Sequence, residues 1–314
     1  MPNPKLRFRF REPTVDTNLP ISDGTVKVEG FDLEVMDVSE EERFGADARD
    51  EGFGALLQRK VEGAPDVCIP AFPNRKFRLS YIYVNAAAGI DSPKDLEGKR
   101  VGIPGWGNTA GVWARGALQN YYGVDLTAVR WRSARPGAGS TAAGIEIGKL
   151  DGDLNAMLVE GALDAVIEPN VLPAITDRDP RVRRLFPDYK AEEQRYFRDT
   201  GIFPISHAVT LTQEFVDRHP QAPVALLEAF RKARDLAFYR ILGPDPQYMV
   251  MSWASAAVDE QRALMGDDYW PYNLERNRRS LEALTQFAHQ QGLTPHRVDY
   301  ESFFSPEAAS LPGA

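Results

Sequence analysis

Three side chains in this sequence stand where they could handle a small anion. His207 lies within an otherwise apolar segment, residues 200–212, and an imidazole can give or take a proton near neutral pH. Arg78 follows an aromatic residue in a predicted strand, and Arg75 precedes it in a turn. A guanidinium binds a carboxylate through two parallel hydrogen bonds. These residues suit acid–base chemistry on an anion, although a hydrogen-bonded structural histidine and solvent-exposed ion pairs are the alternatives.

A glycine-rich loop, residues 105–108, comes directly before a helix predicted at 109–122. The free N–H groups and the positive dipole end of a helix N-terminus favour anions. Asn108 and Thr109 are therefore candidates for contact with a ligand, and Trp106 could stack against a ring. A plain strand-to-helix turn, in which these residues only cap and pack, is the alternative.

The first strand is predicted at residues 6–10. The polar loop that follows it, residues 11–18, offers a further cation and two acids. Loops at the carboxyl ends of strands form ligand sites in open α/β sheets. Arg11 is the cation, and the carboxylates of Glu12 and Asp16 could accept a phenolic proton. The ordinary alternative for each acid is a solvated side chain.

Composition narrows the classes of partner and cofactor. The net charge is −8, and no basic stripe is present, so we expect no nucleic-acid partner. A single cysteine, Cys68, excludes an intrachain disulfide and a cysteine-based zinc cluster, and we expect it to be buried. The four histidines show no metal-binding spacing, which leaves only a carboxylate magnesium site open. No dinucleotide or nucleophile-elbow motif occurs, and we expect no organic cofactor.

Hydropathy gives no sign of a membrane segment. No run of about 18 apolar residues occurs, and the first ten residues lack the apolar core of a signal peptide. We therefore expect a cytoplasmic protein that does not cross a membrane, the alternative being a secreted protein whose signal has been removed. Self-association into a homo-oligomer is compatible with the sequence.

The order of predicted elements indicates two α/β lobes. Strands alternate with helices along the first 212 residues, which predicts parallel pairing through right-handed crossovers. A charged patch at 40–60 is typical of a helix, and more helices are predicted at 221–242, 258–265 and 275–291. The 314 residues suit two lobes with a cleft between them. We place residues 1–85 and 204–314 in lobe one and residues 86–203 in lobe two.

Six segments together resemble the 4,5-dihydroxyphthalate decarboxylase family, which is related to the NMT1/THI5-like, type II periplasmic solute-binding proteins. They are residues 72–78, 92–104, 109–116, 179–187, 200–207 and 264–272. The resemblance implies a type II periplasmic-binding-protein fold and the non-oxidative decarboxylation of a hydroxylated aromatic acid in the cleft. It implies a small aromatic carboxylate as the substrate.

Such a reaction needs a proton donor for the ring carbon and cations for carboxylate groups. With the resemblance, His207 is the expected donor, and Arg78, Arg75 and Arg11 are the expected cations. The alternative is a non-catalytic binding protein for a small anion, which the fold and the Gly105-Trp106 pair would also suit.

Overall fold

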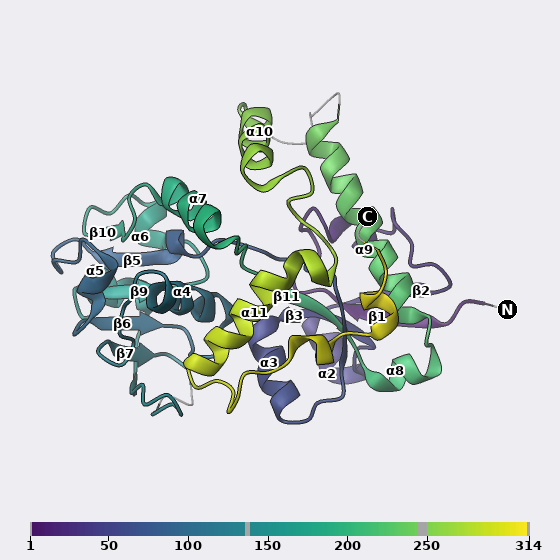
Figure 1. Ribbon diagram of the computed structural model, residues 1–314, viewed down its shortest axis with the longest axis horizontal. Coiled ribbons are helices and arrows are strands. Elements are labelled where there is room, and N and C mark those ends of the chain that lie inside the picture. Colours follow the sequence, from purple (N-terminus) through teal and green to yellow (C-terminus); the bar gives the residue numbers. More distant parts are fainter. Residues whose placement is uncertain (1, 136–138, 244–249, 313–314) are drawn as a thin grey trace.

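The computed structural model describes residues 2–135, 139–243 and 250–312, which form two α/β lobes (Figure 1). The sheet of lobe one has the strand order β2-β1-β3-β11-β4. β1 runs parallel to β2 and β3, whereas β11 runs antiparallel to β3 and β4. The strand bounds are β1 Lys5–Arg9, β2 Asp32–Met36, β3 Ala48–Gly52, β4 Val67–Ile69 and β11 His207–Leu211.

The sheet of lobe two has the order β10-β5-β9-β6-β7-β8. β6 is parallel to β7 and β9, β7 is parallel to β8, and β5 is antiparallel to both of its neighbours. The bounds are β5 Ile82–Asn85, β6 Arg100–Ile103, β7 Arg130–Ser133, β8 Ile147–Lys149, β9 Ala165–Ile167 and β10 Val182–Arg184. The expectation of parallel pairing is therefore wrong for β5, β10 and β11. β5 follows the segment by which the chain enters lobe two, β11 follows its return, and β10 pairs with β5 at the edge of the second sheet.

Helices cover both sheets. The α-helices are α1 Leu19–Ser22, α2 Val38–Phe44, α3 Phe53–Val61, α4 Thr109–Asn120, α5 Leu154–Val159, α6 Pro173–Thr176, α7 Tyr189–Thr200, α8 Gln213–Arg218, α9 Ala222–Leu242, α10 Ala254–Met265, α11 Leu274–Gln290 and α12 Pro306–Ala309. Short 3-10 helices are η1 Leu79–Tyr81, η2 Pro93–Leu96 and η3 Tyr300–Phe303. No helix among the described residues is long and apolar enough to cross a membrane.

Alternation along β1 shows how the sequence builds the first core. Leu6 and Phe8 are completely buried, while the basic residues of the strand, Lys5, Arg7 and Arg9, are more exposed. This two-residue period turns one face of the strand inward. Phe8 packs against Phe230 of α9, with ring centroids 5.9 Å apart. Cys68 of β4 is completely buried in the same core, as expected.

The chain crosses between the lobes where Arg75 and Ile205 form an isolated antiparallel bridge. β5 pairs only with strands of the second sheet, so the change of sheet comes before Ile82. The expected boundary after residue 85 lies beyond this point, because the alternating pattern from 77 to 85 does not show which sheet receives the strand.

The lobes also touch through α4 and α11, which lie side by side in Figure 1. A Cβ atom built on Gly116 of α4 would lie 2.0 Å from Cδ2 of Phe287 of α11. Only glycine allows the two helices to approach this closely. The second lobe is thus packed against the first beside the crossing segments, since Nε1 of Trp113 in α4 donates to the carbonyl of Ile205 at 2.7 Å.

Candidate functional site

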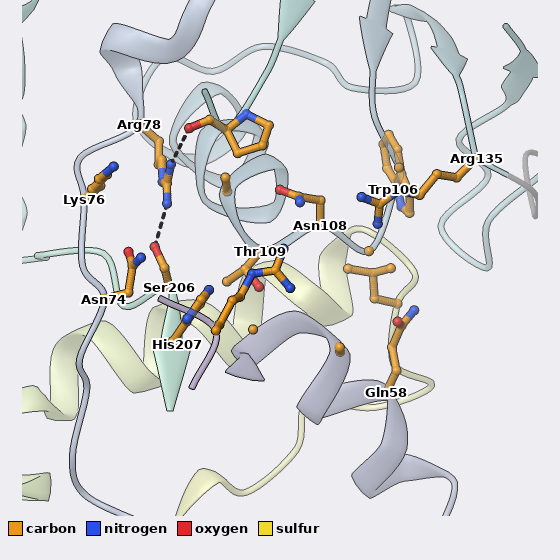
Figure 2. Close-up of a pocket in the computed structure, with 18 of the residues that line it drawn as sticks. Gln58, Asn74, Lys76, Arg78, Trp106, Asn108, Thr109, Arg135, Ser206 and His207 are labelled. Atoms are coloured by element: carbon orange, nitrogen blue, oxygen red, sulfur yellow. Dashed lines mark hydrogen bonds between the residues drawn. The ribbon is translucent and has the colours of Figure 1, made fainter. Parts of the chain in front are cut away.

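A cleft of about 1010 Å³ is lined by residues of both lobes (Figure 2). Lobe one contributes the loop after β1, the start of α3, the crossing segment 73–78 and the start of β11. Lobe two contributes the loop and helix start at 105–110 and Arg135 after β7. The cleft therefore collects loops that follow strand ends, as open α/β sheets do.

His207 is held by a carboxylate that the sequence did not reveal. Its Nδ1 lies 2.7 Å from Oδ1 of Asp50, which is 1% exposed on the neighbouring strand β3. Asn18 donates from Nδ2 to the other oxygen of Asp50 at 3.4 Å. His207 lines the cleft, and its Nε2 makes no hydrogen bond to the described residues. The pair thus presents Nε2 to a molecule in the cleft.

The strand pattern explains why Asp50 was missed. β3 carries Arg49, Asp50 and Glu51 in succession, and the two acids are both buried. Glu51 is satisfied by Arg59 at 2.6 Å and by Thr210 at 2.9 Å. Buried acids remove the alternation of apolar and polar residues that marks a strand, so the segment 40–60 was predicted to be helical throughout. A helix break at Gly45 was the available signal.

Arg78 is a buried cation with no carboxylate partner among the described residues. It is 7% exposed and lines the cleft. Its Nη2 donates to Oγ of Ser206 at 2.6 Å, and its Nη1 donates to the carbonyl of Pro169 at 3.3 Å (Figure 2). Burial lowers the pKa of Arg78 to about 10. An anion in the cleft would supply the charge that the protein does not.

Arg75 also borders the cleft, but protein groups use its guanidinium. Nη1 donates to Oδ1 of Asn277 at 2.7 Å, and Nη2 donates to the carbonyl of Phe203 at 2.7 Å. The guanidinium also lies over the Phe203 ring, 4.4 Å from its centroid. Arg75 therefore fastens the crossing segment to lobe one.

The N-termini of α3 and α4 converge at the cleft. Asn108 caps α4 by accepting from the N–H of Gly111 at 3.3 Å. The hydroxyl of Thr109 accepts from the N–H of Gly54 in α3 at 2.9 Å. A Cβ on Gly54 would lie only 2.5 Å from the carbonyl oxygen of Gly107. Both predicted residues line the cleft, and the Thr109 hydroxyl also ties the lobes together.

Trp106 forms part of the cleft wall in lobe two. Its Nε1 donates to the carbonyl of Gln291 at 2.9 Å. The guanidinium of Arg115 lies 3.8 Å from the ring centroid, and Trp131 packs at 73° to the ring. The indole is therefore fixed, and one of its faces is covered by Arg115.

The first loop divides between two places. Arg11 and Glu12 line the cleft with exposed side chains. Asp16 does not line it; its carboxylate accepts from the N–H of Thr17 and borders a separate hollow between α9 and α10. The turn after Glu12 points Asp16 away, which the sequence spacing does not reveal.

Sequence reasoning missed two cations and an amide in the cleft. Lys76 lies on the crossing segment, and Arg135 lies beyond the carboxyl end of β7. Asn74 adds an amide whose buried Oδ1 has no hydrogen-bond partner. Glu12 is the one acid among the described lining residues. The cleft is thus positive in a protein of net charge −8, which favours an anionic ligand.

No group of three or more metal-ligating side chains occurs among the described residues. The Asp50 carboxylate is occupied by His207 and Asn18. The side chains that line the cleft offer proton transfer by an imidazole and electrostatic binding by guanidinium, ammonium and amide groups.

Comparison with known proteins gives two similar enzymes. A 4,5-dihydroxyphthalate decarboxylase from Comamonas testosteroni is 29% identical over 96% of this chain and 97% of its own length. A protein of the same name from Pseudomonas putida is 33% identical over 57% of this chain and 76% of its own length. A family model described as NMT1/THI5 like matches residues 41–135.

A solved structure supports the fold. The periplasmic aliphatic sulphonate binding protein SsuA from Escherichia coli aligns with a TM-score of 0.59 at 14% identity, covering 97% of this chain and 98% of that one. The two lobes therefore have the type II periplasmic-binding-protein fold that the resemblance implied.

Proposed function

Because the chain belongs to the 4,5-dihydroxyphthalate decarboxylase family and is a carboxy-lyase, we propose that it decarboxylates a hydroxylated aromatic acid in the cleft between its lobes. The substrate we infer is 4,5-dihydroxyphthalate or a close analogue, and His207 is the proton donor. The observation that carries the proposal is the His207–Asp50 pair at the wall of a positive cleft. The charged groups of the two lobes explain how a substrate could be bound beside this pair.

Binding begins with the carboxylates of the substrate. Arg78 offers a buried guanidinium without a carboxylate partner in the described part of the chain, and Ser206 holds it in place. The N-terminus of α4, with Asn108 and Thr109, offers a second positive end. Arg11 and Lys76 add exposed positive charge around the cleft. A carboxylate bound at Arg78 would hold the ring in one orientation.

The reaction then replaces a carboxylate by a proton. Nε2 of His207 gives its proton to the ring carbon that carries the departing carboxylate, and the ring π electrons form the new C–H bond. In 4,5-dihydroxyphthalate each such carbon is para to a hydroxyl, whose oxygen donates electron density to the ring. The carbon–carbon bond to the carboxylate then breaks, its electron pair restores aromaticity, and carbon dioxide leaves. The imidazole regains a proton from water.

Asp50 makes this role possible for His207. Its carboxylate holds the Nδ1 side of the ring, which fixes the orientation of Nε2. Asp50 is only 1% exposed, and its negative charge compensates the positive charge of the protonated imidazole. Glu12, the acid at the cleft, is our candidate acceptor for the phenolic proton.

The test is turnover by purified protein with a panel of hydroxyphthalates and hydroxybenzoates. We expect release of carbon dioxide from 4,5-dihydroxyphthalate and, in deuterium oxide, a product with one ring deuterium at the vacated carbon. His207→Ala should lower the rate by at least about 10²-fold, the usual contribution of a general acid, while substrate still binds. His296→Ala, on an exposed residue, is the matched control and should change neither.

Binding of a small anion without turnover is the outcome that would contradict this proposal, and the fold shared with a sulphonate-binding protein would allow such binding. Ligand-induced thermal stabilisation, no carbon dioxide from any compound, and an unchanged affinity in His207→Ala would together establish binding without catalysis. A cytoplasmic location, a role in aromatic-compound catabolism and self-association stay predictions.

A further inference from the structure

Arg115 is a completely buried cation behind the wall of the cleft. Its Nε donates to Oε1 of Gln291 at 2.8 Å, and its Nη2 donates to the carbonyl of Trp106 at 2.5 Å. Its Nη1 has no hydrogen-bond partner. None of the contacts of the guanidinium within the described residues is with a carboxylate, so its charge is uncompensated.

Two buried arginines of α9 differ from Arg115 in having a carboxylate partner. Arg231 and Arg234 of α9 are almost as buried, but each pairs with a carboxylate: Glu228 at 2.9 Å and Asp235 at 2.7 Å. Leaving a buried charge without a counter-ion is costly, and burial lowers the pKa of Arg115 to about 9. Arg115 carries this cost next to Trp106, which lines the cleft.

The free nitrogen of Arg115 is directed at the N-terminal turn of α4. A Cβ on Gly111, the third residue of this helix, would lie 2.7 Å from Nη1. The residues that begin the helix, from Asn108 to Ala110, line the cleft. A cation is unfavourable at this positive end of the helix dipole. An anion bound there would neutralise both the dipole end and the guanidinium.

We propose that Arg115 supplies the charge of a second anion subsite at the N-terminus of α4, and that it makes the cleft prefer a molecule with two anionic groups. Arg78 binds one group, and the end of α4 binds the other. Arg115 acts through the turn it underlies, so it determines specificity without touching the substrate. The inference rests on the proposed function only in placing the ligand in the same cleft. It does not require that the bound molecule is decarboxylated.

Unreactive probes separate the two subsites. Phthalate has two carboxylates and benzoate has one, and neither carries the hydroxyl groups that the reaction needs. In calorimetric titrations the native protein should bind phthalate more tightly than benzoate. Arg115→Gln should weaken phthalate by about tenfold or more, equivalent to about 1.4 kcal/mol, and benzoate, bound at Arg78, by less than about threefold. Arg115→Lys, which keeps the charge, should restore much of the preference.

Gln291→Glu gives a second variant, because it adds a negative charge at nearly the same volume, although it loses the donation from Nε2 to the carbonyl of Val112 at 2.9 Å. A carboxylate 2.8 Å from Nε would become a permanent counter-ion inside the protein. We expect the same loss of preference for phthalate. If Arg115→Gln does not fold, as judged by circular dichroism, Gln291→Glu and Arg115→Lys decide the question.

Equal weakening of phthalate and benzoate in Arg115→Gln, with no rescue in Arg115→Lys, would mean that Arg115 only supports the Trp106 wall. An unchanged ratio of the two affinities in Gln291→Glu would also overturn the subsite, even in a protein that releases carbon dioxide. Conversely, a protein that binds phthalate through Arg115 but decarboxylates nothing would overturn the proposed function alone.

Discussion

Oδ1 of Asp50 lies 2.7 Å from Nδ1 of His207, and the two residues stand on neighbouring antiparallel strands of lobe one. Asp50 is opposite Val209 in the register, so His207 is its diagonal neighbour on the same face of the sheet. The backbone pairing therefore sets the distance between the acid and the imidazole. A substrate does not have to assemble this pair.

Asp50→Asn should damage catalysis more than binding. The amide keeps the volume but loses the charge that compensates a protonated imidazole, and it can favour the wrong tautomer. We expect kcat to fall by about 10²–10³-fold and KM to change by less than about threefold, measured by carbon dioxide release. Asp66→Asn, which removes a carboxylate paired with Arg59 in the same lobe, is the control for general effects of buried charge. An unchanged kcat in Asp50→Asn would remove Asp50 from the mechanism.

Arg78→Gln should act mainly on substrate affinity. Loss of a buried, hydrogen-bonded charge across an interface costs 2–5 kcal/mol in general, so we expect KM to rise by roughly 30-fold or more. Arg11→Gln at an exposed residue of the same cleft should change KM by less than about threefold, because exposed charges contribute little. Steady-state kinetics on both variants provides the comparison, and similar KM values would contradict a direct role for Arg78.

Gly116→Ala should destabilise the contact between the lobes. The new methyl group would overlap the Phe287 ring, and overpacking of this kind costs about 1–3 kcal/mol. The free energy of unfolding in urea should therefore fall, and Gly116→Ala with Phe287→Leu should recover part of the loss. Gly139→Ala is the control, since no neighbouring atom in the described part of the chain lies within 4 Å of its added Cβ. Equal stabilities of the two alanine variants would show that the helices separate without cost.

Glu193→Gln should raise stability in a pH-dependent way. Burial raises the pKa of the Glu193 carboxyl, although it accepts from the N–H of Ser80 at 2.8 Å. The folded protein therefore holds this proton more tightly than the unfolded chain, and stability is lost as the pH rises from the unfolded pKa through the folded one. Glutamine mimics the protonated form. Its Tm should match the wild type near pH 4 and exceed it by a few degrees at pH 8, whereas a constant difference would exclude ionisation as the cause.

The fold was largely accessible from the sequence. The alternation of buried and exposed residues in β1, and the glycine-rich loop with its capping residue before α4, follow from rules that act within one element. The position of β5 was not accessible, because its residues would suit either sheet and only long-range pairing places it in lobe two. The same limit applies to β11, whose antiparallel direction follows from the return of the chain between the lobes.

The lining of the cleft could be predicted in part. His207 and Arg78 line it, and the sequence pointed to them because a polar group interrupts an apolar strand and a cation follows an aromatic residue. Asp50 could not be found in this way, since a strand of consecutive charged residues has no apolar period. The directions of the side chains in the loop after β1 could not be predicted either. Asp16 stands four residues after Glu12, yet the two border different hollows.

Cys68 has a practical consequence for experiments on this cleft. It is the sole cysteine of the sequence, it has no solvent exposure, and burial raises the pKa of its thiol. Reagents that need an accessible thiolate will therefore leave the folded protein unmodified. Lys76→Cys or Arg135→Cys would give one reactive group on either lobe, and a fluorescent label at either position could follow ligand entry without prior removal of a native cysteine.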